Sequence, residues 1–299
     1  MKMKILRTPE SRFNDLKDYP FQSHYVSIKN VRMHYLDEGP ADSPPVLLLH
    51  GVPAWSYLYR NMIRKIVDEG NRVIAPDLIG FGKSDKPGSI KSHTYQMHVY
   101  WITDFLNTLD LKNIIMFGHD WGSLIGLRIV SKQPELFSSI IISNGMLPAG
   151  EHKIPITFRL WKAFARYSPF LPVDKIIGSG MLRKLDIEEK KAYRAPFPSS
   201  NYKSGIRALP CLVPETKNDP EAEVNRVAWE SLKNWEKPFL TVFSNGDPIT
   251  RDCDEYLRNM IPGARGQNNV RLDARHFIQE DRSSELTDLI IRFIKETRN

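Results

Sequence analysis

Several features that would define a function class are missing from this chain. Only two of its 299 residues are cysteines, Cys211 and Cys253, which form neither a disulfide framework nor a metal cluster of the usual spacing. No stretch approaches the roughly 18 apolar residues that a membrane-spanning helix requires. The charged residues 1–7 are not followed by the apolar segment of a secretory signal peptide. These absences predict a cytoplasmic protein that needs no metal or cofactor and does not enter a membrane.

The charge of the chain is moderate and mixed. It has 42 basic and 35 acidic residues, a net charge of +7, and 41% of its residues are hydrophobic. This is an ordinary composition for a soluble globular protein. Short clusters such as 188–191 combine both signs, which favours a solvated surface over a patch that binds nucleic acid. Nucleic acid is therefore not expected as a partner.

Apolar runs and amphipathic segments alternate along most of the chain. The run 45–49 is continuously apolar, as in a strand buried on both faces. The pattern also predicts a hairpin of strands 24–28 and 31–36, further strands at 72–76, 113–117, 138–143, 238–244 and 269–272, and helices ending near 68 and spanning 95–109, 124–130, 224–235, 253–260 and 284–297. Such alternation is typical of an α/β protein with a mostly parallel sheet between helices. Its ligands bind at the carboxyl ends of the strands, where we place His50, Asp77, Asp120 and Asn144.

The alternation stops between residues 148 and 223. This segment is rich in proline, aromatic and basic residues, and it predicts short helices at 156–167, 174–185 and 187–193. We interpret it as a helical cap inserted between two parts of the core, residues 1–147 and 224–299. Its aromatic residues belong either to the core of the cap or to the lining of a pocket, and core packing is favoured for any one of them: Trp161, Phe164, Tyr167 and Phe197.

The stretch 117–122 joins a predicted strand to a predicted helix. It reads Phe-Gly-His-Asp-Trp-Gly, a Gly-x-nucleophile-x-Gly turn that lifts the central side chain out of an α/β sheet. That position is usually serine, and here it is Asp120. A carboxylate, with a reference pKa of about 3.9, is charged at neutral pH and needs no base to attack a saturated carbon. The alternative for Asp120 is a helix N-cap, which is a common role of aspartate.

Two later residues complete a predicted nucleophile, acid and base. Asp247 ends a predicted strand, and His276 lies in a loop after the last one. The chain order Asp120, Asp247, His276 is the order of this architecture, with Asp247 orienting His276; a turn-forming role is the alternative for Asp247. The backbone N–H groups of Val52 and Trp121 are the expected oxyanion donors.

The loop 77–84 ends in Gly-Lys-Ser and superficially resembles a phosphate-binding loop. The P-loop pattern requires a glycine where Asp77 stands, and residues 87–88 are Pro-Gly where its helix should continue. We therefore interpret Asp77 and Ser84 as residues that fix the loop.

Four stretches together resemble the haloalkane dehalogenases: 50–60, 77–87, 120–122 and 192–198. The similarity covers nearly the whole chain, and the cap stretch is its most specific part. The resemblance implies an α/β-hydrolase fold with an inserted cap, and a halide-binding pair formed by Trp121 and Trp161. It also implies a small halogenated alkane and water as substrates, alcohol and halide as products, an alkyl-aspartate intermediate, no cofactor, and a monomer or weak homo-oligomer.

Two positions depart from the family pattern, and other activities remain as alternatives. Val52 stands where relatives tend to have Glu or Asn, and Ser123 where a second glycine is usual. An epoxide hydrolase shares the aspartate but requires acidic donors from the cap, for which the candidates are Tyr167, Tyr193 and Tyr202. A fluoroacetate-type dehalogenase is disfavoured because Trp121 replaces the arginine that would follow the nucleophile. A catalytically idle binding protein on this fold is the remaining alternative.

Overall fold

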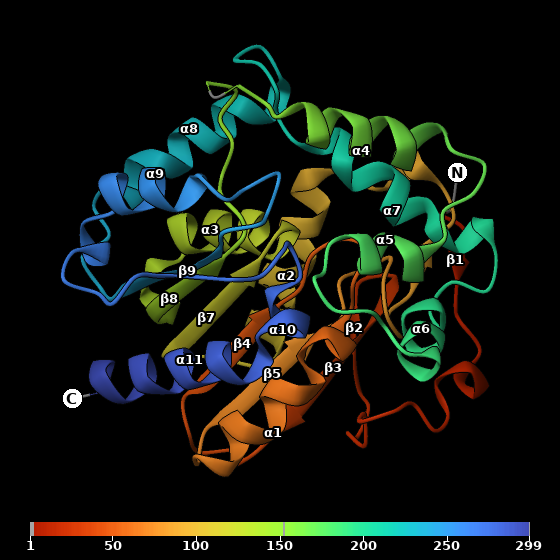
Figure 1. Ribbon diagram of the computed structural model, residues 1–299, viewed down its shortest axis with the longest axis horizontal. Helices are drawn as coiled ribbons and strands as arrows, with labels where there is room; N and C mark the ends of the chain where they lie inside the picture. Colours follow the sequence, from red (N-terminus) through yellow and green to blue (C-terminus); the bar gives the residue numbers. More distant parts are fainter. Residues whose placement is uncertain (1–2, 152, 299) are drawn as a thin grey trace.

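The computed structural model describes residues 3–151 and 153–298 of the chain. Within these residues a central sheet contains the strands β2 (His24–Ile28), β3 (Val31–Glu38), β4 (Pro45–Leu49), β5 (Arg72–Pro76), β7 (Ile114–His119), β8 (Phe137–Ser143), β9 (Phe239–Ser244) and β10 (Val270–Leu272) (Figure 1). Their order is β10-β9-β8-β7-β4-β5-β3-β2. Strand β3 pairs antiparallel with β2 and β5, and the other neighbours are parallel. The predicted mostly parallel sheet is confirmed.

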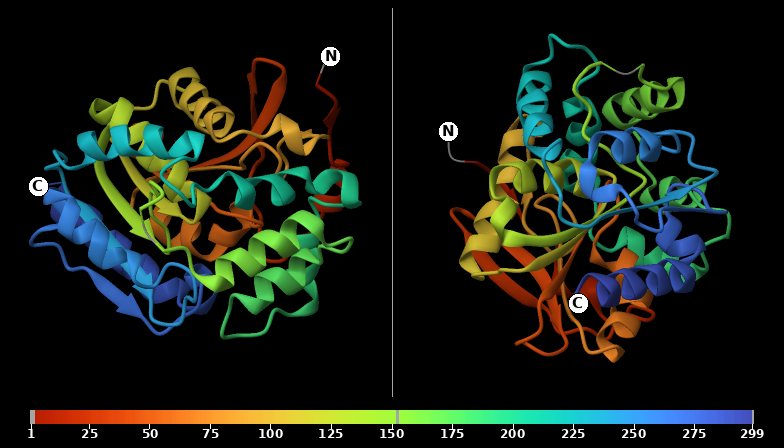
Figure 2. Two further views of the ribbon diagram at one scale, coloured as in Figure 1. Left: turned by 90° about the horizontal axis from the view of Figure 1, so that it is seen from above. Right: turned by 90° about the vertical axis from the view of Figure 1, so that its left-hand side faces the viewer.

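Helices cover both faces of this sheet. Helices α1 (Arg60–Asp68) and α11 (Ser283–Thr297) pack together on one face, and α2 (Tyr95–Thr108), α3 (Trp121–Lys132) and α8 (Pro220–Leu232) pack on the other (Figures 1 and 2). Helix α9 (Cys253–Met260) packs beside β9, and the short α10 (Ile278–Asp281) precedes α11. Because both faces are covered, every residue of β4, β7 and β9 is buried. Their continuous apolar runs follow from this position.

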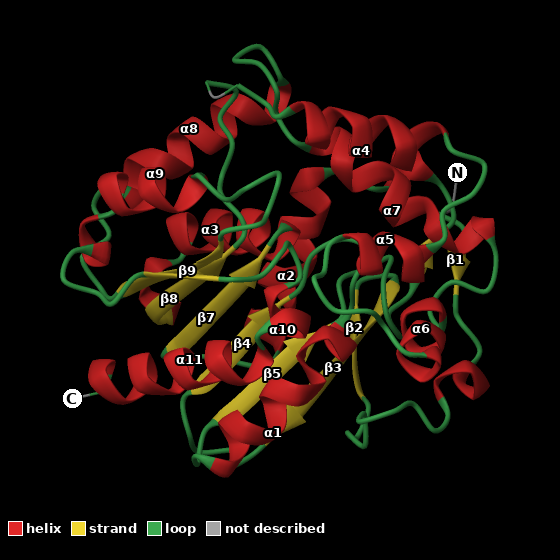
Figure 3. Ribbon diagram, in the orientation of Figure 1, coloured by secondary structure: helices red, strands yellow, loops and turns green. Residues whose placement is uncertain are grey.

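The predicted cap is a group of short helices above the carboxyl ends of the parallel strands (Figures 1 and 3). They are α4 (Ile156–Tyr167), α5 (Val173–Ser179), α6 (Ile187–Arg194) and α7 (Ser204–Ala208). Helix α6 begins with a capping box formed by Asp186 and Glu189. The outer limits of the predicted core, residues 1 and 299, lie outside the described residues, as does residue 152 at the start of the cap.

The predicted helix 174–185 is wrong in its second half. Helix α5 ends at Ser179, and Gly180 then packs against the loop that follows β10. A Cβ on Gly180 would lie 2.8 Å from the Phe277 ring, and the Phe277 N–H donates to the Gly180 carbonyl over 2.9 Å. The helix end has a local cause as well, because Gly178 and the C-cap residue Gly180 disfavour a longer helix.

Several other boundaries differ from the prediction by a few residues. Helix α3 begins at Trp121 rather than 124, and helix α8 begins at Pro220 rather than 224. Proline suits that position because its missing N–H would lack a helical partner in any case. The prediction also missed α7 and a small antiparallel pair, β1 (Ile5–Leu6) with β6 (Lys86–Pro87). Two-residue strands carry no periodic signal. Among the described residues, none of the helices has both the length and the apolar character needed to cross a bilayer.

The loop 77–84 is held together by its own polar residues, as predicted. Asp77 is buried and accepts hydrogen bonds from the backbone N–H of Ser56 at 2.8 Å and of Lys83 at 2.7 Å, and its carboxylate lies 2.7 Å from Nδ1 of His34. Ser84 Oγ donates to the Asp77 carbonyl over 2.7 Å. The roles of Asp77 and Ser84 in fixing the loop are confirmed.

Helix α3 approaches β4 so closely that Gly122 has no space for a side chain. A Cβ there would lie 1.9 Å from the Leu49 carbonyl oxygen, which is backbone and cannot rotate away. We expect Gly122→Ala to destabilise the fold by about 1–3 kcal/mol and to lower the midpoint of thermal unfolding. Gly178→Ala is the matched control, because nothing lies within 4 Å of its Cβ position. Equal midpoints for the two variants would contradict this close approach.

Candidate active site

The turn between β7 and α3 holds Asp120 in a backbone conformation that few non-glycine residues adopt. Its φ is 48° and its ψ is −124°. Small residues surround it: a Cβ on Gly51 would lie 2.3 Å from an Asp120 carboxylate oxygen, and one on Gly145 would lie 1.9 Å from Ser123 Oγ. Strained residues persist where the surrounding structure enforces them, and they cluster at functional sites. The structure therefore contains the elbow that the Gly-x-Asp-x-Gly pattern predicts.

Ser123, one of the two departures from the family pattern, supports this turn. Its hydroxyl donates to the Asp120 carbonyl oxygen over 2.5 Å, and its backbone N–H donates to the same oxygen over 2.9 Å. The Asp120 N–H donates to the Asn144 carbonyl oxygen over 3.3 Å. Both backbone polar groups of Asp120 are therefore satisfied, which secures the conformation.

The carboxylate of Asp120 does not cap the helix that it precedes, so the N-cap alternative is wrong. Instead Oδ2 accepts a hydrogen bond from the Val52 N–H over 2.7 Å. Burial raises the pKa of Asp120 above its usual value, and the positive charge of His276 and the N–H groups of Val52 and Trp121 limit that rise. The groups around Asp120 thus favour its charged form, in opposition to burial.

Asp247 and His276 meet at the strand ends, where the sequence predicted. Asp247 Oδ2 lies 3.0 Å from His276 Nδ1, and its carboxylate also accepts from the Thr250 hydroxyl and, over 3.0 Å, from the Ile249 N–H. Burial alone would raise the pKa of Asp247, but His276 and these donors lower it to about 2. Burial alone would lower the pKa of His276, but the charge and hydrogen bond of Asp247, with the charge of Asp120, raise it to about 9.

Two buried side chains donate hydrogen bonds to the backbone carbonyl of His276. Its carbonyl oxygen accepts from His119 Nε2 over 2.8 Å and from Asn144 Nδ2 over 2.8 Å. Burial lowers the pKa of His119 to about 3, so the ring is neutral and its Nε2–H is the donor. The sequence placed Asn144 at a strand end but gave it no role, and it gave no signal for His119 beyond its position beside Asp120.

A cavity of about 660 Å³ lies between these residues and the cap. Its size suits an organic ligand, and its lining includes Val52, Asp120, Trp121, Phe158, Trp161 and His276. Trp121 comes from the first turn of α3 and Trp161 from the inner side of α4. Within residues 3–151 and 153–298, neither indole N–H has a hydrogen-bond partner. Two unpaired N–H donors in an apolar wall can bind a polarisable anion.

The remaining cap aromatics do not line this cavity. Phe197 is buried in the core, whereas Phe164 is 42% and Tyr167 81% exposed. The expectation that these residues are core or pocket is therefore wrong for Phe164 and Tyr167, which are both exposed on α4. Tyr193 is buried and donates to Glu280. The three candidates for the acidic donors of an epoxide hydrolase, Tyr167, Tyr193 and Tyr202, are all absent from the described cavity lining.

The strand-end residues converge only in part. Asp120 lines the cavity and Asn144 supports His276, but His50 and Asp77 lie outside the cavity lining. His50 is buried among loop backbone groups: Nε2 accepts from the Leu78 N–H over 2.9 Å, and Nδ1 lies 2.8 Å from the Gly51 carbonyl oxygen. Among the described residues, no cluster of three or more His, Cys, Asp or Glu side chains is placed to hold a metal ion.

The fold and the site place this chain in a known class of proteins. A family model for the alpha/beta hydrolase fold matches residues 44–283, and the chain belongs to that family. It is also 50% identical over 294 residues to a haloalkane dehalogenase of Mycolicibacterium paratuberculosis, with 97% of this chain and 98% of the relative aligned. It is 48% identical to a haloalkane dehalogenase of Psychrobacter cryohalolentis, covering 98% and 99% of the two chains.

A solved structure gives the same result. The tetrameric haloalkane dehalogenase DpaA from Paraglaciecola agarilytica NO2 superposes with a TM-score of 0.89 at 33% identity, over 96% of this chain and 97% of that one. The chain therefore belongs to the haloalkane dehalogenase family.

The Asp247–His276 pair predicts how His276 titrates. Its raised pKa means that folding stabilises the imidazolium; this contribution is complete below about pH 6.5 and is lost as the pH rises through about 9. In Asp247→Asn the opposing effect of burial should dominate, so the pKa should fall well below 9. NMR titration of labelled histidine measures both values. His119 is the internal control, because its ring should stay neutral above pH 5 in both proteins. An unchanged midpoint for His276 would exclude the electrostatic role of Asp247.

Proposed function

We propose that this protein is a haloalkane dehalogenase that hydrolyses the carbon–halogen bond through an alkyl ester of Asp120. One observation carries the proposal: a strained, half-buried carboxylate faces an apolar cavity and is held by the Val52 N–H at 2.7 Å. Such a group is an anion next to the position of an apolar substrate. The family membership supports the same reaction.

The first step needs only the carboxylate and the anion site. An Asp120 oxygen attacks the carbon that bears the halogen, the C–O bond forms, and the halide leaves with the bonding electrons. Trp121 and Trp161 donate their indole N–H groups to the departing halide, since an indole is a donor without an acceptor. Val52 places an apolar side chain at the cavity wall in place of the polar one of relatives, so the two tryptophans supply the halide contacts.

The second step regenerates the carboxylate. His276, oriented by Asp247, takes a proton from water, and the hydroxide attacks the ester carbonyl carbon of Asp120. The backbone N–H groups of Val52 and Trp121 stabilise the resulting oxyanion. Alcohol leaves, and the proton is lost from His276 to solvent. Alkylation removes the Asp120 charge that helps to raise the pKa of His276, so the pKa of the imidazole falls when the ester has formed, and a larger fraction of it is neutral and able to accept a proton.

The predicted organisation and setting belong to the same proposal. Residues 148–223 form the cap that closes the cavity, between core parts 1–147 and 224–299. The partners are a small halogenated alkane, water and halide, without a cofactor. Both cysteines are free in the structure, as in a reducing compartment, which supports a cytoplasmic location. We propose a monomer or weak homo-oligomer.

Replacing the base separates the two steps. In His276→Gln the first step should proceed with Asp120 intact, so that one equivalent of halide appears as a burst and the alkyl group stays bound to the protein. Ion chromatography of bromide and the mass of the intact protein measure these outcomes with 1-bromobutane. Asp120→Asn is the control, with neither burst nor added mass. Steady turnover by His276→Gln would refute the role of the base, and diol formed from an epoxide by wild type would favour the rival hydrolase.

Removal of one halide donor should act on the first step. Trp161→Phe keeps the apolar volume but loses the indole N–H, so we expect the rate of alkylation to fall by about 10- to 100-fold, as for the loss of one hydrogen bond that strengthens in the transition state. Rapid-quench measurement of bromide release gives this rate. Trp235→Phe, outside the cavity lining, is the matched control. Equal rates in the two variants would remove Trp161 from the halide site.

A further inference from the structure

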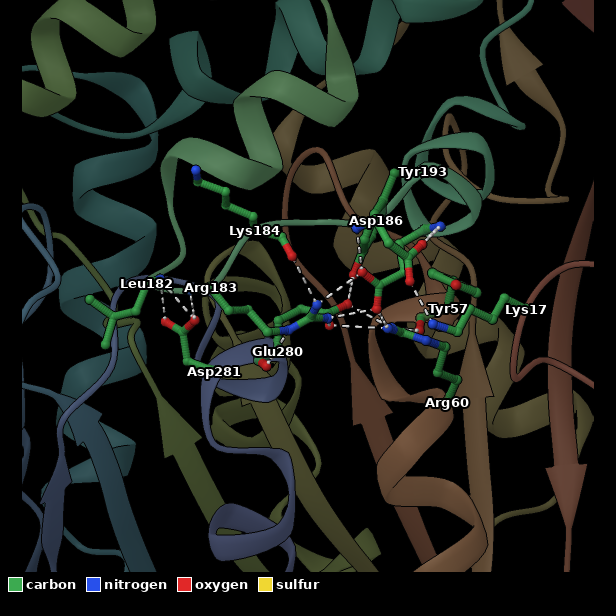
Figure 4. Close-up of polar contacts among 11 residues, drawn as sticks. Lys17, Tyr57, Arg60, Leu182, Arg183, Lys184, Asp186, Tyr193, Glu280 and Asp281 are labelled. Atoms are coloured by element: carbon green, nitrogen blue, oxygen red, sulfur yellow. Dashed lines mark hydrogen bonds and ion pairs between the residues drawn. The ribbon is translucent and has the colours of Figure 1, made fainter.

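One carboxylate joins the cap to the loop that carries His276. Asp281, in α10, accepts hydrogen bonds from the backbone N–H groups of Leu182 at 2.8 Å and Arg183 at 3.2 Å, in the segment after α5. It also accepts from the Arg275 N–H at 2.9 Å, directly before His276. Figure 4 shows the Asp281 carboxylate turned toward the Leu182 backbone. Three N–H groups from two separate segments thus converge on a single side chain.

Two further contacts close the same junction. The Phe277 N–H donates to the Gly180 carbonyl over 2.9 Å, and Arg275 Nη1 donates to the Ser179 carbonyl over 3.3 Å. A Cβ on Gly180 would lie 3.5 Å from the Cβ of His276. Residues 179–180 therefore contact the Arg275 side chain and the Phe277 backbone, on the two sides of His276.

A buried ion cluster immobilises α10 itself. The Glu280 carboxylate accepts from Arg60 Nη1 over 2.6 Å, and the Glu280 carbonyl accepts from Arg183 Nε over 2.9 Å. Both arginines also bind Glu189 of α6 at 2.9 Å, and Tyr193 donates to Glu280 (Figure 4). Because core and cap charges share these partners, α10 has little freedom relative to either. Asp281 is therefore held on a rigid support.

We infer that Asp281 is a positioning residue for the hydrolytic step of the proposed function, on which this inference rests. His119 and Asn144 hold the His276 carbonyl from the core, and Asp281 holds the Arg275 N–H from the side of the cap. His276, the proposed base, is therefore held by contacts from both the core and the cap side of the molecule. No atom of Asp281 lies in the described cavity lining, so it acts on His276 through the backbone.

The inference predicts an effect on one step only. Asp120 and Trp121 are held by β7, α3 and β4, and none of these elements contacts Asp281 through the hydrogen bonds described above. Alkylation should therefore be unaffected by the loss of Asp281. Hydrolysis of the ester requires His276, water and the ester carbonyl in line, and misplacement of a catalytic group by about 1 Å is enough to slow a reaction about 100-fold.

The test compares Asp281→Ala and Asp281→Asn with the wild type in single-turnover experiments on 1-bromobutane. The alanine removes all three acceptor contacts. The asparagine keeps the shape but presents an N–H₂ donor where one of the N–H groups must be accepted. Asp219→Ala is the matched control, because Asp219 also accepts two backbone N–H groups, those of Glu215 and Thr216 at 2.7 Å, in a loop that does not contact His276. Thermal unfolding shows that each variant is folded.

We expect hydrolysis of the alkyl-enzyme, followed by mass spectrometry, to slow by about 10- to 100-fold in Asp281→Ala. The alkylation rate, followed by bromide release, should stay within about twofold of wild type, and the alkyl-enzyme should accumulate. Asp281→Asn should show the same pattern to a smaller degree, and Asp219→Ala should match wild type in both steps. Equal slowing of both steps, or slowing of neither, in the folded variants overturns the inference. Failure of wild type to release bromide would instead overturn the proposed function.

Discussion

A negative charge buried at the end of a parallel strand is the constraint on which this structure depends. An isolated carboxylate in an apolar interior is strongly unfavourable unless donors meet it. The fold supplies the Val52 N–H at 2.7 Å and the first backbone N–H of α3. For the carboxylate to reach them, Asp120 must adopt its positive φ, and Gly51, Gly122 and Gly145 must lack side chains. The pattern of small residues around the elbow follows from the need to bring backbone donors close to one anion.

The three charged residues of the site, Asp247, His276 and Asp120, influence one another, because His276 interacts with both carboxylates. Asp247 raises the pKa of His276, and His276 in turn limits the rise in the pKa of Asp120. Each protonation state therefore depends on the next residue, and a change in the charge of Asp120 reaches His276 without any movement of the backbone. In the proposed cycle this coupling lowers the pKa of the imidazole once the nucleophile has been esterified, so that more of it is neutral and able to accept a proton from water.

The sequence predicted the parts of the molecule that have a local cause. The apolar run 45–49 and the Gly-x-Asp-x-Gly turn specify a buried strand and an elbow wherever they occur, and both are present. The end of α5 at Ser179 also has a local signal, the C-cap residue Gly180, which the prediction overlooked. The support that His119 and Asn144 give to His276, by contrast, depends on three segments that meet only in the folded chain. The identity of a single residue does not indicate which distant residue it will contact, so these hydrogen bonds to His276 could not be predicted from the sequence.

The cap also occupies a particular place in the connectivity. Strands β8 and β9 are parallel neighbours in the sheet, and the cap helices and α8 form the connection between them. A crossover of this kind must exist in any case, because parallel strands cannot be joined by a tight turn. Its length can therefore vary during evolution while the strand register is preserved. Substrate preference can therefore change with the cap while the catalytic residues stay the same. A changed cap must still preserve the contacts of Asp281, because these contacts join the cap to the loop that carries His276.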